Sequence, residues 1–432
     1  MIVGLHGGRV QLGGAEPLPL IGRKARCVVN DRKGLAMFSI GSSGRQPCRT
    51  GVLVMAVGLL MAGCQDSPPP MSPTVPPPES AAGASLPVEI EAQGTWTIEA
   101  VDAANMVGTH SSIAVDASGN PRISYHDETA GTLKYARFTG SSWSIETVPD
   151  ADAHVGHHTS LRLDASGNPR IAYARGTTDI YSALKYARWT GAAWSIETVD
   201  QQAQGVGVDA SLALDSNGNP HISHHKAWGQ QGLRYAKKTG SKWSKETVES
   251  GPGDGRGSSI EVDPSGSVHI SYKAEGMVKY ARRSGSTWSI EVVDPEGGRE
   301  DTSLELDSAG NPHLTYRGSG GFGAVGPLKY ARRSGAAWDI QVVDPLDGSG
   351  APYSSLDFDS LGNPHIAYYD WGAGDLKYAR WTGSAWAIEA VDSAGDVGSH
   401  CSLVVDGSSV VHISYYDETN GDLKYARQTP PL

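Results

Sequence analysis

The chain has 432 residues, including 54 glycines and only four phenylalanines, and its formal net charge at pH 7 is −11. Residues 1–63 contain eight Lys/Arg and two acids, so the rest of the chain has 28 basic and 45 acidic residues and a net charge of −17. A surface this acidic repels a phosphate backbone, which argues against nucleic acid as a partner. The composition, with 11 Trp and 17 Tyr, is typical of many short strands joined by tight turns.

The N-terminal region reads as an export signal. Arg45 and Arg49 precede an apolar run over 51–61, too short to span a bilayer as a helix, and small residues then lead to Cys64. The ending Met-Ala-Gly-Cys resembles the lipobox of bacterial lipoproteins. That resemblance implies a lipid on Cys64 and, because Gln65 follows, delivery to the outer membrane or cell surface. A plain signal peptide is the alternative. We therefore predict a signal region over 1–63, with Met37 as a candidate true start.

Residues 64–93 are predicted to form a tether behind the lipidated cysteine. Proline fixes φ and removes a backbone donor, so the segment QDSPPPMSPTVPPPES cannot build a core. The remaining cysteines are Cys27, Cys48 and Cys401. After export only Cys64 and Cys401 would remain, which excludes a disulfide framework.

From residue 94 the chain repeats itself. The clearest marker is LKYAR and its variants, in seven copies spaced 45 to 51 residues apart. The copies are Leu133–Arg137, Leu184–Arg188, Leu233–Lys237, Val278–Arg282, Leu328–Arg332, Leu376–Arg380 and Leu423–Arg427. This period is typical of β-propeller blades.

Each repeat contains four strand-like runs. A Ser-Leu-x-Leu-Asp run leads through an Asp-x-x-Gly-Asn-Pro turn to a His-Ile-Ser-Tyr-Tyr run, then to LKYAR and to Trp-x-Ile-Glu-x-Val. Apolar residues alternate, and no stretch has a sustained helical period. The sequence therefore predicts an all-β, seven-bladed β-propeller of four-stranded antiparallel blades over residues 94–432.

The ends of the repeat region predict a closed ring. The fourth-run Trp occurs at Trp96, before any first run, while the last repeat stops after Arg427 without a Trp run of its own. We expect residues 95–101 to complete the blade that begins at Ser402, which would leave no terminal blade edge unpaired.

At these residues the chain resembles a group of bacterial secreted proteins with tandem SLALDSxGNPHISYYD…LKYA…GSxW units, and the resemblance covers 94–427. It implies a propeller and no particular activity. The chain is also loosely similar to the Asp-box propellers of sialidases. It has the Gly-x-x-Trp half of that motif, as in Gly140–Trp143, but the Ser-x-Asp half is missing, which argues against a sialidase.

Candidate site residues are those that vary between repeats, because positions shared by every blade serve the scaffold. Two residues before the first-run Ser the seven copies carry His110, His158, Asp209, Gly257, Asp301, Tyr353 and His400. Ring order would place His400, His110, His158 and Asp209 in successive blades around the axial opening. These four side chains could bind a divalent cation, or the set could contact a polar ligand or simply shape the loops.

The connections between the second and third runs form the other variable set. We selected Asp127, Trp228, Asp370, Trp371 and Asp417 as candidate ligand contacts. Trp228 and Trp371 lie outside the recurring Trp positions, and an exposed Trp beside a carboxylate is a common sugar platform. The alternative is that these loops pack on their neighbours.

No catalytic motif is present, and Cys401 beside His400 is a poor nucleophile candidate because adjacent strand residues point to opposite faces. The sequence favours a monomeric, membrane-anchored binding or adhesion propeller without a required cofactor, contacting glycan or a surface protein at its axial face and the membrane only through the lipid. A glycan-active hydrolase or lyase and a structural envelope lipoprotein are the alternatives.

Overall fold

The computed structural model describes residues 4–6, 9–11, 94–177, 180–202, 205–227, 231–251, 253, 255–320, 325–346 and 350–429. The chain divides into two compact units, Met1–Ser85 and Leu86–Leu432. In the first unit, β1 (Gly4–His6) pairs with β2 (Arg9–Gln11) as an antiparallel hairpin. Cys64, the signal segment around it and the tether lie outside the described residues. Across the described ranges, no helix is long and apolar enough to cross a membrane.

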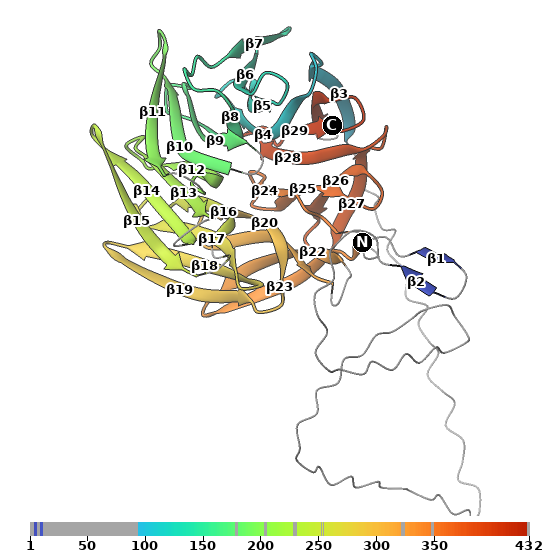
Figure 1. The fold of residues 1–432 in the computed structure, drawn as a ribbon. Coiled ribbons are helices and arrows are strands. Elements are labelled where there is room, and N and C mark those ends of the chain that lie inside the picture. Colours follow the sequence, from blue (N-terminus) through green and yellow to red (C-terminus); the bar gives the residue numbers. More distant parts are fainter. Residues whose placement is uncertain are drawn as a thin grey trace, which may run out of the picture. The chain divides into compact units, whose positions relative to one another are not determined.

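The second unit confirms the predicted propeller of seven blades, each a sheet of four antiparallel strands (Figure 1). Blade 1 is built from β4 (Val107–Val115), β5 (Pro121–Asp127), β6 (Thr132–Phe138) and β7 (Trp143–Thr147). Blade 2 is built from β8 (Val155–Leu163), β9 (Pro169–Thr177), β10 (Ile180–Trp189) and β11 (Trp194–Gln201). Blade 3 is built from β12 (Val208–Leu214), β13 (Pro220–Lys226), β14 (Gly232–Thr239) and β15 (Lys242–Ser250).

Blades 4 to 7 follow the same order. They are built from β16 (Arg256–Val262), β17 (Val268–Ala274), β18 (Met277–Ser284), β19 (Thr287–Asp294); β20 (Gly297–Leu306), β21 (Pro312–Ser319), β22 (Val325–Ser334), β23 (Ala337–Asp344); β24 (Ser354–Phe358), β25 (Pro364–Asp370), β26 (Asp375–Trp381), β27 (Trp386–Asp392); and β28 (Val397–Val405), β29 (Val411–Asp417), β30 (Asp422–Thr429) with β3 (Thr95–Asp102).

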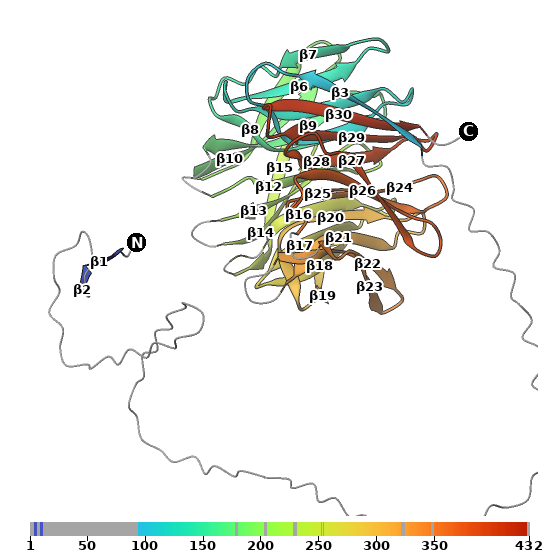
Figure 2. The same cartoon turned by 90° about the vertical axis from the view of Figure 1, so that its right-hand side faces the viewer.

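The N-terminal strand closes the ring, as the sequence predicts. β3 pairs antiparallel with β30, from Thr95 opposite Thr429 to Asp102 opposite Leu423. Figure 2 shows β3 beside β30 in the last blade. The seventh blade is therefore assembled from both ends of the described propeller.

The recurring Trp packs between blades. Each fourth-strand Trp meets the LKYAR Tyr of the preceding blade edge-to-face, with ring centroids 5.2 to 5.5 Å apart. Trp338 against Tyr280 (5.4 Å) is one of the seven pairs, and Trp96 against Tyr378 (5.2 Å) extends the pattern across the closure. These residues belong to the scaffold.

Buried Asp–His–Tyr chains explain the turn Asp and the LKYAR Tyr. In blade 7 the imidazole of His412 lies 2.6 Å from the Tyr425 hydroxyl through Nδ1 and 3.3 Å from Asp406 through Nε2. Similar contacts recur in blades 3 to 6, whereas blades 1 and 2 replace the His with an arginine that pairs with the turn Asp. Although such chains resemble catalytic triads, their repetition marks them as structural.

A ring of inter-blade hydrogen bonds surrounds the axis. The backbone N–H of the residue after each first-strand Ser donates to the Ser Oγ of the preceding blade, at 2.9 to 3.2 Å. The accepting serines are Ser402, Ser112, Ser160, Ser211, Ser259, Ser303 and Ser355, in blade order. All seven junctions carry the bond, including the one between blades 7 and 1.

Replacing one of these serines tests the ring. Ser259→Ala removes the acceptor for the backbone N–H of buried Leu304, so we expect the free energy of unfolding to fall by about 1–3 kcal/mol. The acceptor lost is the one that Leu304 N–H reaches at 3.1 Å. Ser289→Ala, whose exposed hydroxyl donates to the Arg282 carbonyl, is the control and should change stability by less than about 0.5 kcal/mol. Equal losses in chemical denaturation would contradict a special role for the ring.

Candidate functional site

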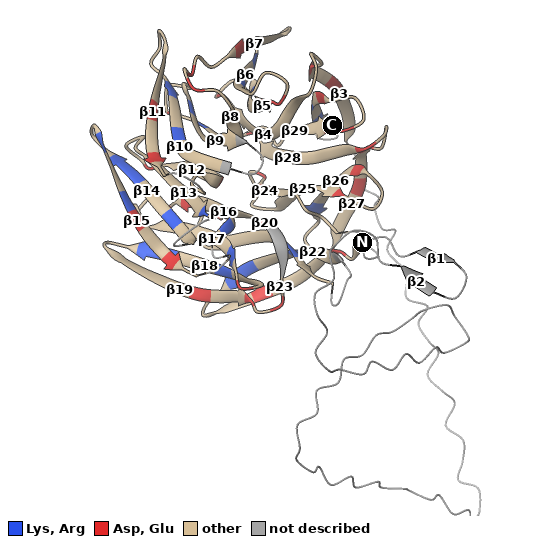
Figure 3. Cartoon of the chain, in the orientation of Figure 1, with Lys and Arg blue, Asp and Glu red and all other residues tan. Residues whose placement is uncertain are grey.

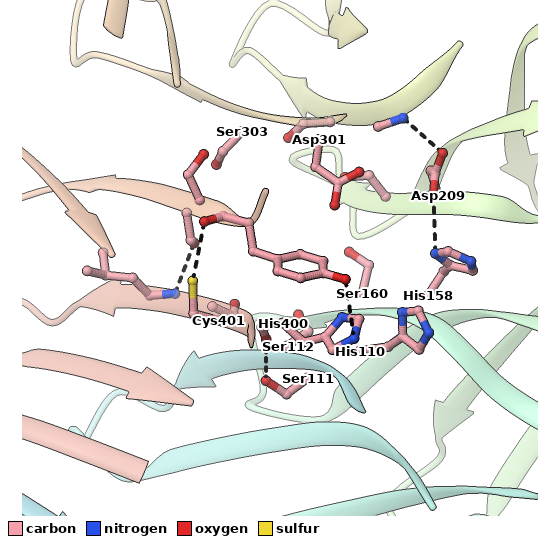
Figure 4. A pocket seen from close by; sticks show the side chains of 18 of the residues that line it. His110, Ser111, Ser112, His158, Ser160, Asp209, Asp301, Ser303, His400 and Cys401 are labelled. Atoms are coloured by element: carbon pink, nitrogen blue, oxygen red, sulfur yellow. Dashed lines mark hydrogen bonds and ion pairs between the residues drawn. The ribbon is translucent and has the colours of Figure 1, made fainter. Parts of the chain in front are cut away.

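A cavity of about 680 Å³ lies on the propeller axis, and every blade contributes its first strand to the wall. The lining also includes Tyr369 near the end of β25, Trp371 just after it, and Asp396 and Glu418 from the connections that precede β28 and follow β29. We call these four the rim. Figure 4 shows His400, His110, His158 and Asp209 following one another along the wall, with Asp301 across from them. The variable positions selected from the sequence therefore do meet around one space.

Five of these side chains form a continuous contact series, which we call the crown: Tyr353, His400, His110, His158 and Asp209. The ring centroids of Tyr353 and His400 are 4.4 Å apart, and His110 lies 4.5 Å from both His400 and His158. His158 Nδ1 is 3.3 Å from Asp209 Oδ1, and Asp209 Oδ2 accepts the Gly257 N–H at 2.9 Å. The crown thus runs through blades 6, 7, 1, 2 and 3.

The backbone explains part of the residue choice in the crown. His110, His158, Asp209, Gly257 and His400 all have φ between 50° and 55°, the left-handed region in which His, Asp and Gly are over-represented. The first strand bulges here, and a Ser or Thr hydroxyl of the next blade donates to the carbonyl of the left-handed residue, as Thr159 Oγ1 does to His110 at 2.8 Å. We missed this constraint from the sequence, although a His/Asp/Gly alternation is its signature.

The crown imidazoles are neutral at pH 7. Burial holds the pKa of His110 well below its ordinary value, and four neighbouring histidines lower it further. Burial also lowers the pKa of His400 to about 3. Behind the crown, the His126 and His157 rings lie 4.0 Å apart, and burial with imidazole repulsion lowers their pKa values to about 3 and about 4. The site therefore presents aromatic rings without cationic charge.

The geometry gives the predicted divalent cation no ready ligand set. The His110 ring is tilted by 49° to the His158 ring and to the His400 ring, with centroids 4.5 Å away in both cases. Within the described ranges, no group of three or more His, Cys, Asp or Glu side chains is arranged to hold a metal ion.

A second set of charged residues, not predicted from the sequence, lies on the same first strands. Arg162 and Glu305 line the cavity, and Arg162 pairs with Glu261 at 2.7 Å. Burial, together with Glu261 and Asp357, raises the pKa of Glu305 well above its ordinary value. Burial also raises the pKa of Asp357 to about 6, although two backbone N–H groups donate to it. We call Arg162, Glu261, Glu305 and Asp357 the inner cluster.

The amino-acid sequence contains a pattern that could have identified the inner cluster. Its members all occupy position x of Ser-Leu-x-Leu, two residues after the Ser that faces the axis, and residues i and i+2 share one side of a strand. That position varies between blades, as a site residue should.

The structure places the other residues selected from the sequence in different environments. Asp301, Tyr353 and Trp371 line the cavity, and Trp371 is 58% exposed. Trp228 lies outside the described residues. Cys401 is buried, and burial raises the pKa of its thiol to about 12, in agreement with its rejection as a nucleophile.

Asp127, Asp370 and Asp417 do not line the cavity. They are at most 5% exposed, and each pairs with the Lys of LKYAR in its own blade at 2.7 to 3.5 Å. Each also accepts a backbone N–H from its own turn, as Asp127 does from Ala130 at 2.8 Å. These carboxylates hold the connecting turns in place.

Comparison with known proteins shows the fold. An ulvan lyase from a new family of polysaccharide lyases superposes with a TM-score of 0.57 at 14% identity, covering 76% of this chain and 95% of the lyase. A protein of unknown function from Dyadobacter fermentans gives a TM-score of 0.50 at 10% identity, with 79% and 99% covered. The fucose-binding Aleuria aurantia lectin gives 0.48 at 14% identity, with 67% and 98% covered. This chain shares the propeller fold. No family model matches it, and neither does any curated protein.

The buried histidines predict a pH-dependent stability. Their folded pKa values lie below the ordinary value of 6.5, so the unfolded chain binds protons that the folded chain does not. The free energy of unfolding should be undiminished above about pH 6.5 and should fall as the pH drops from there towards about 4. Denaturation at a series of pH values measures this slope.

The double variant His126→Gln/His157→Gln should flatten that slope, whatever it does to stability at pH 7. Ser289→Ala, which removes no titratable group, should leave the slope unchanged. A slope that is the same in all three proteins would show that the buried imidazoles are not its source.

Proposed function

We propose that this protein is a glycan-binding propeller that engages a saccharide in its axial cavity. The observation that carries the proposal is the cavity itself: about 680 Å³, within the size range of small-ligand sites, and walled by neutral rings and carboxylates. Sugars present an apolar face and a set of hydroxyls, and this wall offers partners for both.

The rim supplies an aromatic platform beside two carboxylates. Trp371 is more than half exposed, which is unusual for so large an apolar side chain. Tyr369 donates from its hydroxyl to Asp396 at 2.5 Å. The backbone N–H of Asp396 donates to the Thr419 hydroxyl, and Glu418 N–H donates to the Asp396 carbonyl, so the two connections of blade 7 support each other. The platform is preorganised.

The proposal places the protein outside the cytoplasm, anchored through a lipid on Cys64. The support is the lipobox-like Met-Ala-Gly-Cys and the proline-rich segment behind it. A tether of that composition would hold the propeller away from the membrane, leaving the cavity open to ligands. Metabolic labelling with a fatty-acid probe and a Cys64→Ser control tests the anchor.

Trp371→Ala tests the platform. Removing the ring should weaken binding of the best glycan found on an array about tenfold, or ~1.4 kcal/mol, as measured by calorimetry. The control is Leu361→Ala. Leu361 is 85% exposed, but it lies in the turn between β24 and β25, on the opposite face of the propeller. Equal affinity of the two variants, or no glycan bound by the parent protein, would overturn the proposal.

A glycan hydrolase is the second candidate, and Glu305 favours it. A carboxyl group in a cavity wall whose pKa burial raises well above its ordinary value suits a general acid, with a carboxylate of the same wall as its partner. Reducing ends should then be released from the bound glycan by the parent protein and not by Glu305→Gln, with binding retained. Binding without product would rule out the hydrolase.

A further inference from the structure

The charge of the axial cavity specifies the class of ligand. Five carboxylates line it, and the single arginine in the wall, Arg162, is already paired with Glu261. The five are Asp209, Asp301, Glu305, Asp396 and Glu418. The carboxylates that line the cavity therefore outnumber its one guanidinium. The crown imidazoles add no positive charge at neutral pH.

Among the described residues that line the cavity there is no lysine. Figure 3 shows Lys and Arg along β14, β15 and β18, which are third or fourth strands of their blades. Two lysines of the blades that carry the rim are paired with acids: Lys377 with Asp370 at 2.7 Å and Lys424 with Asp392 at 2.5 Å. The lining of the cavity is therefore richer in carboxylates than in cations.

We propose that the cavity selects amino sugars, glycans that carry protonated amines in the manner of glucosamine. This inference rests on the proposed function and deepens it. An ammonium group brings three donors and a positive charge to carboxylates that have spare acceptor capacity. Uronic acids and sulfated sugars bring a like charge into the same space, which opposes their binding.

The rim is where the amine binds. Glu418 and Asp396 are exposed carboxylates that lie together, since their backbones are hydrogen-bonded at 2.9 Å. Asp396 Oδ1 already accepts from Tyr369, which fixes the carboxylate and leaves its other oxygen available to a ligand. Trp371 lies on the same rim, so one sugar residue can stack on the indole while its amine meets the acids.

The aromatic wall distinguishes an amino sugar from a simple polyamine. Exposed Trp371 offers a face that suits the C–H face of a pyranose, and Tyr353 and the crown imidazoles line the same cavity. A flexible polyamine would satisfy the carboxylates without using those faces. The ligand class that uses both features of the cavity is an oligosaccharide with free amines.

Calorimetry with four probes tests the inference at about pH 6, where primary amines are charged and burial disfavours protonation of the crown imidazoles. The probes are glucosamine oligomers, N-acetylglucosamine oligomers of equal length, oligogalacturonate and spermidine. We expect the glucosamine oligomers to bind at least tenfold more tightly than the other three, with an affinity that falls as salt rises.

Asp396→Asn/Glu418→Gln should remove most of this preference while changing the affinity for the acetylated oligomers less than twofold. Glu275→Gln is the matched control, because Glu275 is an exposed acid in the turn between β17 and β18, on the same face but outside the cavity. It should bind like the parent.

The outcomes separate the two proposals. Binding of acetylated or anionic glycans in preference to glucosamine oligomers would overturn the inference and leave the glycan-binding function standing. Spermidine binding as tightly as the oligomers would also overturn it, since the sugar would then contribute nothing. Failure of every array glycan and every probe would overturn the proposed function itself.

Discussion

The hydrogen bond between a first-strand serine and the next blade is the contact on which this fold depends. The innermost strand of each blade is a sheet edge, with backbone groups that have no partner in their own sheet. Near the axis those groups are buried, so they must be satisfied across the blade junction. A serine hydroxyl is short enough to do so without separating the strands, and the bond occurs at all seven junctions.

The same arrangement separates scaffold from site. Shared residues make the junctions: the serines, the Trp–Tyr pairs and the Tyr–Asp–Lys contacts, such as Tyr125 and Lys134 on Asp102. Residues that differ between blades fill the space that the junctions enclose. Because the ring brings seven variable positions to one axis, a nearly uniform repeat can build an asymmetric cavity with a histidine side and an acidic side.

Much of the fold follows from the repeat alone. The unmatched Trp96 and the missing Trp after Arg427 predict the closure between β3 and β30, because a strand with no partner at one end must pair at the other. The site was only partly predictable. Comparing equivalent positions of the seven repeats identified His110 and His400, but it did not predict the left-handed backbone that favours these residues. The bulge in the first strand breaks the alternation of side chains on which that comparison relies.

The acidic residues between the second and third strands were selected as ligand contacts because these connections vary between repeats. The structure gives Asp417 other partners: Lys424 pairs with it, and Asn420 donates hydrogen bonds to both of its carboxylate oxygens within the turn. Glu305 was overlooked because between two leucines it reads as the solvent side of a strand. Only the closed ring shows that this side is the axial wall.

The split seventh blade has a consequence for how the chain matures. β3 is the earliest propeller strand to leave the ribosome, and its partner β30 is the last. The ring cannot shut until β30 has been synthesised, and until then β3 offers a bare edge that invites mispairing. A chain that ends before β30 would lose that partner and leave the seventh blade incomplete. Closure of the ring is therefore coupled to synthesis of the last propeller strand, because only a chain that contains both β3 and β30 can complete the seventh blade.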